Sequence, residues 1–194
     1  EFNDTIGVDL FQLGDVHGNA ASFLNITDLS SEFQVVAHVF SKRPDHVLQT
    51  FMSAWTLWAG LPKVLLSDGG GEFNKEFSEE LSDLEVETRR TAAYSLTQNA
   101  RVERHGGRWK AIAKALIMEF GIAWRGPEWR TAWLLSCANN AVNTAINESG
   151  YSPSQWVLGR GLKLPYGMLG THGRLAAQTR LGRDPVFAQR VAMS

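Results

Sequence analysis

Three acidic residues of the sequence stand in places where a carboxylate is unusual. Asp9 lies inside the apolar run 7–11, where an acidic group is costly to bury unless a cation or a hydrogen-bond donor meets it. Asp68 comes at the end of the predicted short strand 63–66 and precedes glycines that permit close approach of a ligand. Glu103 lies near the start of a predicted helix. If the strands that carry Asp9 and Asp68 are neighbours, Glu103 could complete a set of three hard oxygen ligands suited to Mg²⁺ or Mn²⁺.

A second possible metal-binding pattern occupies residues 13–19, which read LGDVHGN. Asp15 and His17 look like the first metal-binding block of the calcineurin-like phosphoesterases. A two-metal phosphatase needs several more ligands from other loops, but the sequence contains neither Gly-Asp-x-x-Asp nor Gly-Asn-His. The stretch also joins two predicted strands and is rich in the residues that hairpin loops favour. We therefore interpret it as a hairpin loop and keep a metallophosphatase as an alternative.

Length and composition are those of one domain without a membrane-spanning helix. The chain has 194 residues, and it contains no run of about 18 apolar residues that could cross a bilayer. Cys137 is the only cysteine, which excludes a disulfide within the chain and a cysteine-based zinc site. The sequence is therefore not that of a disulfide-stapled or zinc-finger domain.

The net charge of −1 hides an uneven distribution along the chain. Residues 1–150 hold 13 basic and 19 acidic residues, whereas residues 151–194 hold six basic residues and one acidic residue. Within the first part, segment 89–114 contains seven basic residues and a single carboxylate, that of Glu103. Such a segment favours a polyanionic partner, although a solvated helix surface would give the same pattern.

The apolar pattern predicts a mixed α/β domain over residues 1–150, followed by a basic, irregular extension over 151–194. The predicted strands are 6–13, 22–29, 33–40, 63–66 and 86–89, and the predicted helices are 44–59, 73–83, a segment from about 98 onward and a segment from 127 to about 147. The first three strands are rich in Val, Ile and Phe and are separated by short polar gaps, which is typical of an antiparallel meander.

Four sequence blocks, in the right order, resemble those of integrases from retroviruses and LTR retrotransposons. Residues 67–73 (SDGGGEF) are similar to the family's Ser-Asp-Asn-Gly-x-Glu-Phe block, and residues 94–104 (YSLTQNARVER) to its Tyr-x-Pro-x-x-Asn-Gly-x-Val-Glu-Arg block. Asp9 with its neighbours looks like the family's first-strand Asp, and residues 152–160 (SPSQWVLGR) resemble the Ser-Pro block near the end of the retrotransposon core. The resemblance covers roughly residues 5–165.

The resemblance implies an RNase H-like fold with a mixed five-stranded sheet flanked by helices. It implies a catalytic triad of Asp9, Asp68 and Glu103 that binds Mg²⁺ or Mn²⁺. The implied activity is that of a polynucleotidyl transferase with endonuclease activity, which processes the ends of retroelement cDNA and joins them to target DNA. A homo-oligomer, action in the nucleus and an earlier stage in a cytoplasmic particle are implied by the same resemblance.

Five basic residues near Glu103 are candidates for binding DNA. Lys110 and Lys114 follow Glu103 by seven and eleven residues, which places them on the same side of the predicted helix. There they would contact phosphates near the scissile bond, although lysines that are merely solvated would have the same spacing. Similar candidates in the same segment are Arg101, Arg104 and Arg108.

The chain departs from the family pattern at several positions close to the predicted triad. Gly69, Leu96 and Ala100 replace the usual Asn, Pro and Gly. His105-Gly106-Gly107-Arg108 follows Glu103-Arg104, where the family more often shows an aromatic residue and then His or Asn. Two alternatives therefore stay open. One is an RNase H-like nucleic-acid-binding module, catalytically impaired or domesticated, and the other is an RNase H-like nuclease that uses water as its nucleophile.

Overall fold

The structure is a computed structural model. It describes residues 1–68, 70–73, 75–90, 96–147 and 150–161, and within these it describes only the backbone of residues 72, 75–76 and 96–103. The chain divides into two compact units, Glu1–Asn143 and the segment from Thr144 onward. The first unit contains every candidate catalytic residue.

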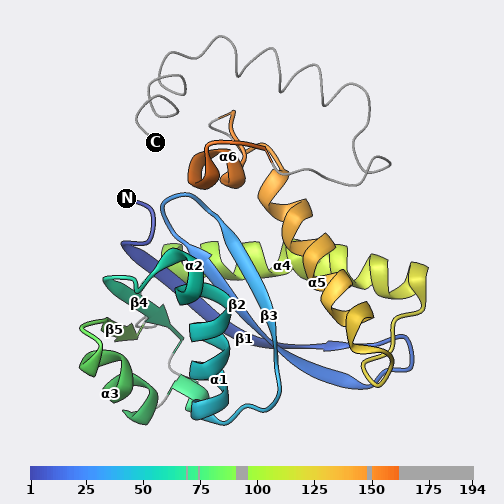
Figure 1. Cartoon of the computed structure of the whole chain (residues 1–194), viewed down its shortest axis with the longest axis horizontal. Coiled ribbons are helices and arrows are strands. Elements are labelled where there is room, and N and C mark those ends of the chain that lie inside the picture. Colours follow the sequence, from blue (N-terminus) through green and yellow to red (C-terminus); the bar gives the residue numbers. More distant parts are fainter. Residues whose placement is uncertain (69, 74, 91–95, 148–149, 162–194) are drawn as a thin grey trace. The chain divides into compact units, whose positions relative to one another are not determined.

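A mixed five-stranded sheet forms the centre of the first unit, with the strand order β3-β2-β1-β4-β5 (Figure 1). The strands are β1 (Thr5–Gly14), β2 (Ala20–Asp28), β3 (Gln34–Val39), β4 (Val64–Ser67) and β5 (Glu87–Arg90). The first three strands pair antiparallel, whereas β4 runs parallel to β1 and β5 runs parallel to β4. The predicted meander and the predicted mixed sheet are therefore confirmed.

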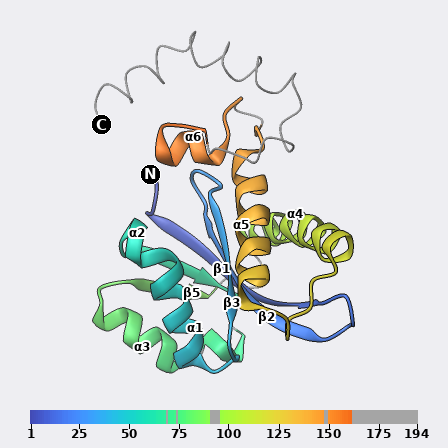
Figure 2. The same cartoon turned by 45° about the vertical axis from the view of Figure 1, so that its right-hand side comes forward.

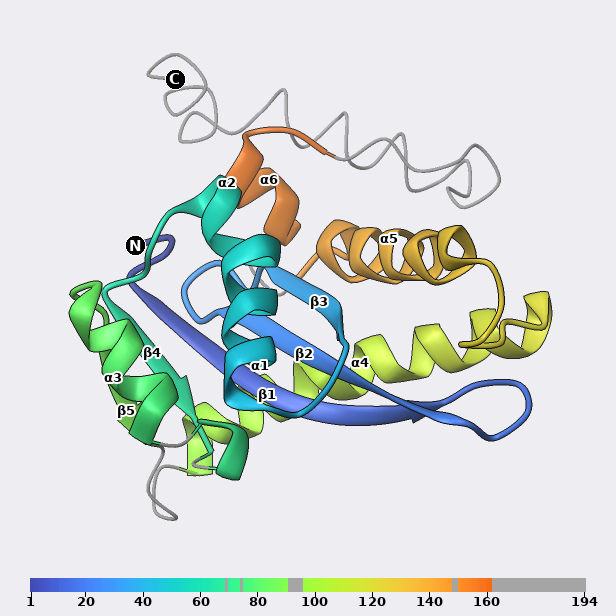
Figure 3. The same ribbon diagram turned by 60° about the horizontal axis from the view of Figure 1, so that its bottom comes forward.

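Helices cover both faces of this sheet. They are α1 (Pro44–Phe51), a π-helical turn (Met52–Thr56), α2 (Leu57–Ala59), α3 (Lys75–Asp83), α4 (Leu96–Phe120) and α5 (Glu128–Thr144). The views of Figures 1 and 3 place α1 on one face and α4 on the opposite face, and α3 contacts α1 and β5. Within the described part of the chain, none of the helices is long and apolar enough to cross a membrane.

The segment after residue 150, expected to be irregular, contains the helix α6 (Pro153–Leu158). Ser152 begins it with a capping box, in which its side chain accepts the backbone N–H of Gln155 and the Gln155 side chain accepts the backbone N–H of Ser152. Pro153 at the first helical position fits this start because it lacks an N–H that would otherwise need a partner. The expectation of an irregular segment was therefore wrong for these residues, and residues 162–194 lie outside the described part.

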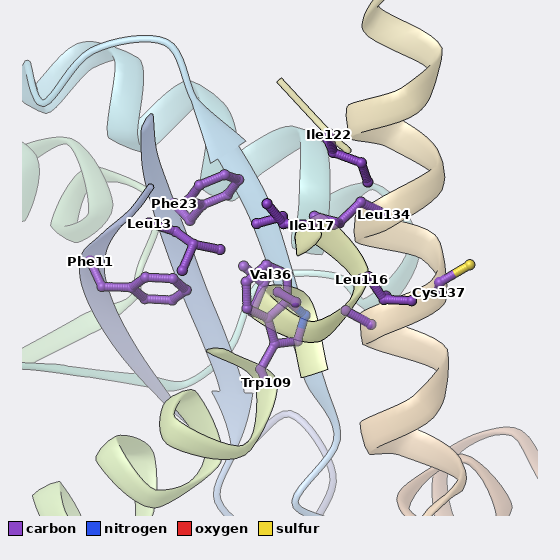
Figure 4. Packing of buried hydrophobic residues seen from close by; sticks show 12 residues of the cluster. Phe11, Leu13, Phe23, Val36, Trp109, Leu116, Ile117, Ile122, Leu134 and Cys137 are labelled. Atoms are coloured by element: carbon purple, nitrogen blue, oxygen red, sulfur yellow. The ribbon is translucent and has the colours of Figure 1, made fainter. Parts of the chain in front are cut away.

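A cluster of buried apolar residues lies between the sheet, α4 and α5 (Figure 4). Its members are Phe11, Leu13, Phe23 and Val36 from the strands, Trp109, Ala113, Leu116 and Ile117 from α4, Ile122 after it, and Leu134, Cys137 and Ala138 from α5. Gly121, with φ of 59°, ends α4 in the left-handed region that L-residues with a side chain rarely adopt. The chain can therefore turn there and bring α5 back onto the same cluster.

Helix α5 closes the free edge of the sheet with two asparagines one helical turn apart. Asn139 accepts the backbone N–H of Val36 and donates to its carbonyl, both at 3.0 Å. Asn143 does the same to Gln34, at 2.8 and 2.6 Å. The distance along α5 between the two asparagines matches the distance along β3 between their partners, because four helical residues advance about 6 Å and two strand residues about 6.7 Å. The outward backbone groups of Gln34 and Val36 are thus satisfied, and this part of the β3 edge is not free to pair with another strand.

Candidate active site

The strands that carry Asp9 and Asp68 lie side by side, as the proposed site requires. In the parallel pairing of β1 with β4, Ile6 lies opposite Leu65 and Gly7 opposite Leu66. Continuing this register by two residues places Asp9 beside Asp68, which directly follows the last residue of β4. Paired residues of neighbouring strands project to the same face of a sheet, so both carboxylates belong to one face.

That face is the one covered by α4. Along β1 the residues alternate between faces, and Phe11 and Leu13, which share the parity of Asp9, pack in the cluster with α4. Asp9 is half-buried, whereas Asp68 is exposed and its Oδ1 accepts the backbone N–H of Gly70 at 2.9 Å. Two carboxylates, one of them accessible to solvent, therefore stand at the end of β4 under the helix that carries Glu103.

Glu103 belongs to the first half of α4, as predicted, but its side chain lies outside the described residues. Gly106, three residues after Glu103, shows where this helical turn of α4 lies. Gly106 is buried, and a Cβ on it would lie 3.4 Å from Nδ2 of Asn25, which is the residue paired with Asp9 across β1 and β2. The turn of α4 that carries Glu103 therefore adjoins the part of the sheet that carries Asp9.

The donor groups fit a hard divalent cation. Asp9, Asp68 and Glu103 would supply carboxylate oxygens, which Mg²⁺ and Mn²⁺ prefer, and one oxygen of Asp68 makes no hydrogen bond to the described residues. Among the side chains that the structure describes, no group of three His, Cys, Asp or Glu residues could hold a metal ion. Glu103 is not one of these side chains, so the three-ligand site stays a prediction.

The basic candidates on α4 divide between two sides of the helix. Lys110 is half-buried, and its Nζ lies 4.3 Å from the ring centre of Phe11, two residues along β1 from Asp9. Lys114 is exposed one turn further along the same side. At about 100° per residue, the remaining candidates point to a different side from Glu103. These are Arg104 and Arg108, both exposed, and Arg101, whose side chain lies outside the described residues.

The stretch with Asp15 and His17 is the loop of the β1–β2 hairpin, as predicted. The Asp15 carboxylate accepts the backbone N–H groups of His17 and Asn19, each at 2.8 Å, the side-chain amide of Asn19 and the backbone N–H of Trp124. His17 itself is exposed. Oδ1 of Asp15 is engaged within the loop, and Oδ2 links the hairpin to the segment between α4 and α5 through Trp124. Because both oxygens already have donors, this arrangement argues against the metallophosphatase alternative.

These hydrogen bonds predict an acid-sensitive contribution of Asp15 to stability. Burial raises the pKa of Asp15, but hydrogen bonds from the Asn19 side chain and from the N–H groups of Trp124, Asn19 and His17 outweigh it and lower the pKa from 3.8 to about 2. Because the folded-state pKa is the lower one, the contribution is complete above about pH 4 and is lost as the pH falls towards 2.

Asp15→Asn should therefore melt several degrees below the wild type at pH 7, and the gap should narrow as the pH falls from 4 towards 2. His17→Ala, which changes an exposed side chain of the same loop, should melt with the wild type. Thermal denaturation of the three proteins between pH 2.5 and 7 measures this. A difference in melting temperature between Asp15→Asn and the wild type that stays constant from pH 2.5 to 7 would contradict the role assigned to the Asp15 carboxylate.

The fold is that of retroviral integrase catalytic cores. The HTLV-2 integrase catalytic core domain, solved in complex with magnesium, matches with a TM-score of 0.63 and 17% identity, covering 79% of this chain and 95% of that one. The BIV integrase catalytic core matches with a TM-score of 0.63 and 14% identity, over 81% and 95%. A chain of the simian T-cell lymphotropic virus intasome in complex with the PP2A regulatory subunit B56 gamma matches with a TM-score of 0.67 and 18% identity, over 84% and 56%.

No protein-family model and no curated protein sequence matches the chain. The structural likeness therefore establishes the fold, and the RNase H-like architecture expected from the four sequence blocks is confirmed.

Proposed function

We propose that the chain is the catalytic core of an integrase of the LTR-retrotransposon type. In this proposal it is a Mg²⁺- or Mn²⁺-dependent polynucleotidyl transferase, which processes the ends of retroelement cDNA and joins them to target DNA. Its partners are these two DNAs and further copies of the chain. It acts in the nucleus after an earlier stage in a cytoplasmic particle.

One observation carries this proposal more than any other, namely the register of β1 against β4. It brings Asp9 and Asp68, which are 59 positions apart in the sequence, to neighbouring positions on one face of the sheet. The same face is covered by the helix that carries Glu103. This supports a site in which the carboxylates of Asp9 and Asp68 and the Glu103 side chain would act together.

In this region Asp9 and Asp68 would hold one cation between them, and Glu103 would hold a second. Bound metal ions would activate the attacking hydroxyl group and stabilise the leaving oxygen of an in-line displacement. Lys110, fixed over Phe11, and the exposed Lys114 would bind phosphates of the DNA beside the carboxylates. Their contacts position the DNA backbone and do not depend on base sequence.

The proposed oligomer rests on the similar proteins as well as on the family resemblance. The HTLV-2 core was solved in a dimeric and in a trimeric form, and the simian T-cell lymphotropic virus protein in an intasome. We propose that this chain also acts as a homo-oligomer, which would let two DNA ends be joined in one complex.

The proposed activity is tested by offering the chain two labelled duplexes, one with a free 3′-hydroxyl end and one without, in the presence of Mg²⁺ or Mn²⁺. A transferase yields a joined product longer than either strand. A nuclease that uses water yields only shortened strands, and a binding module that lacks catalysis shifts the DNA in a gel without changing its length. Either of the last two results would replace the proposed function with the corresponding alternative.

The phosphate contacts predict how salt should affect DNA binding. Lys110→Ala with Lys114→Ala should weaken binding and flatten the dependence of log K on log[salt] by about 0.9 per lost contact, or about 2 for the pair. Titrations of labelled duplex at several salt concentrations measure the slope.

A control variant, Lys42→Ala with Lys63→Ala, removes the same charge elsewhere, since Lys42 precedes α1 and Lys63 precedes β4 and pairs with Asp4. It should leave the slope close to that of the wild type. Equal slopes for all three proteins would show that the α4 lysines make no phosphate contacts.

A further inference from the structure

The middle strand of the meander carries a polar residue in its apolar centre. Asn25 lies between Leu24 and Ile26 on β2 and is 0% exposed. It shares the parity of Phe23, which packs in the cluster with α4, so its side chain belongs to the α4 face. A buried amide is costly unless its polar atoms are bonded, so its presence here needs a reason.

Two neighbouring side chains fix the orientation of this amide. Oδ1 of Asn25 accepts Nε2 of Gln34 at 2.8 Å and Oγ1 of Thr27 at 3.3 Å. Oε1 of Gln34, also buried, has no hydrogen-bond partner among the described residues. An unpaired buried acceptor lowers stability, so this polar cluster is not the arrangement that core stability alone would favour.

The amide nitrogen of Asn25 lies next to Gly106 of α4. A Cβ on Gly106 would lie 3.4 Å from Nδ2 of Asn25, whereas a Cβ on Gly107 would meet nothing within 4 Å. The first of the two adjacent glycines therefore permits close packing of α4 over Asn25. The first side-chain carbon at position 106 would already touch the amide, so a branched side chain such as valine would have to move the helix or the amide.

Asn25 is at the same time the direct partner of Asp9 across the two strands. Directly opposite residues have Cβ atoms about 4.5–5.5 Å apart and project to the same face. The Asn25 side chain therefore stands beside Asp9 on one side and against Gly106, one helical turn after Glu103, on the other.

We propose that Asn25 is a positioning residue of the metal site. Its fixed amide sets how closely α4 approaches β1, and so sets the separation between Glu103 and Asp9 that the cations require. The inference rests on the proposed function, because it assumes that Asp9 and Glu103 bind metal. It adds a residue that binds neither metal nor DNA, and it gives the unusual glycine at position 106 a reason.

The test measures Mn²⁺ affinity directly, from the EPR signal of the free ion in a titration of the full chain. Asn25→Leu removes the amide at nearly constant volume and should weaken Mn²⁺ binding by 10-fold or more, the usual effect of losing a group that orients metal ligands. Asn143→Leu is the matched control, since Asn143 is also buried and also bonds Gln34, but at the sheet edge. It should change Mn²⁺ affinity less than twofold.

A second pair of variants tests the same idea without removing Asn25. Gly106→Val and Gly107→Val place the same side chain at adjacent positions of α4, with the same helix propensity. Only the first should weaken Mn²⁺ binding, because only position 106 faces Asn25. If Asn25→Leu fails to fold, this pair of variants still tests the positioning role of Asn25.

The outcomes separate this inference from the proposed function. Unchanged Mn²⁺ affinity in folded Asn25→Leu, or equal affinities for the two valine variants, overturns the positioning role alone. A wild-type chain that binds no Mn²⁺, or binds it equally well after Asp68→Asn, overturns the proposed metal site and this inference with it.

Discussion

Asp68→Asn is expected to lower metal-dependent strand joining by about 10³-fold or more. The substitution keeps the size of the side chain but removes the negative charge that would bind the cation shared with Asp9. Losing one ligand of a two-metal site removes several kcal/mol of transition-state stabilisation, and each 1.36 kcal/mol is a factor of about ten in rate. Since Asp68 is exposed and bonds only Gly70 among the described residues, folding should be unaffected.

The matched control is Asp83→Asn, the same chemical change at the exposed last residue of α3. It should retain full joining activity, and circular dichroism should show that both variants are folded. The double variant Asp15→Asn with His17→Ala, assayed below its melting temperature, should also keep most of the activity. Phosphomonoesterase activity that is lost in this double variant but survives Asp68→Asn would reinstate the metallophosphatase.

The second large effect is expected for the fold itself. Trp109→Ala should lower the free energy of unfolding by about 3–5 kcal/mol, the usual cost of truncating a large buried aromatic residue. Trp109 is 0% exposed, contacts Phe11 and Phe23, and donates from Nε1 to Oδ1 of Asn139 at 2.8 Å. Its loss opens a cavity and also weakens the asparagine contact that closes the β3 edge. Domains are typically stable by about 5–15 kcal/mol, so this loss would be a large part of the total stability.

Trp129→Ala provides the comparison, because Trp129 lies at the start of α5 and is 64% exposed. This substitution should lower the free energy of unfolding by less than about 1 kcal/mol. Urea denaturation followed by far-ultraviolet circular dichroism measures the free energy of unfolding of both variants. Similar midpoints for the two variants would show that the cluster between the sheet and α4 does not dominate the stability of the first unit.

The elements could be predicted from the sequence because each has a clear local pattern. The three predicted strands 6–13, 22–29 and 33–40 correspond to β1, β2 and β3. The predicted helix 44–59 corresponds to α1, the π-helical turn and α2. The hairpin loop was predicted within residues 13–19 from their composition. Its connection to Trp124 was not, because the hydrogen bond joins residues 109 positions apart.

Contacts between distant segments are what the sequence could not supply. Asn139 and Asn143 lie among small residues that suggest close helix packing, and their role follows only from the position of β3 at the sheet edge. Asn25 is a single polar residue between apolar neighbours, and nothing in the sequence marks it as special. Its position beside Asp9 depends on the register of β1 against β2. The capping box of α6 has a sequence signature, since Gln155 follows Ser152 by three residues, and this pattern predicts the start of a helix where an irregular segment was expected.

The candidate site was predicted residue by residue from the four sequence blocks. The structure adds the adjacency of β1 and β4 and the position of α4, on which the site depends. The sequence alone left this adjacency as a condition, because strand order is set by packing of the whole sheet and not by the strands themselves. Figure 2 shows how α4 and α5 come together beside the β1–β2 hairpin.

The most direct test of the proposed metal site is an anomalous difference map from crystals of the chain saturated with Mn²⁺. The proposal predicts a peak within coordination distance of both the Asp9 and the Asp68 carboxylates, with the Glu103 side chain turned towards the same region. Mn²⁺ bound elsewhere, with the Asp9 and Asp68 carboxylates too far apart to share an ion, would contradict it.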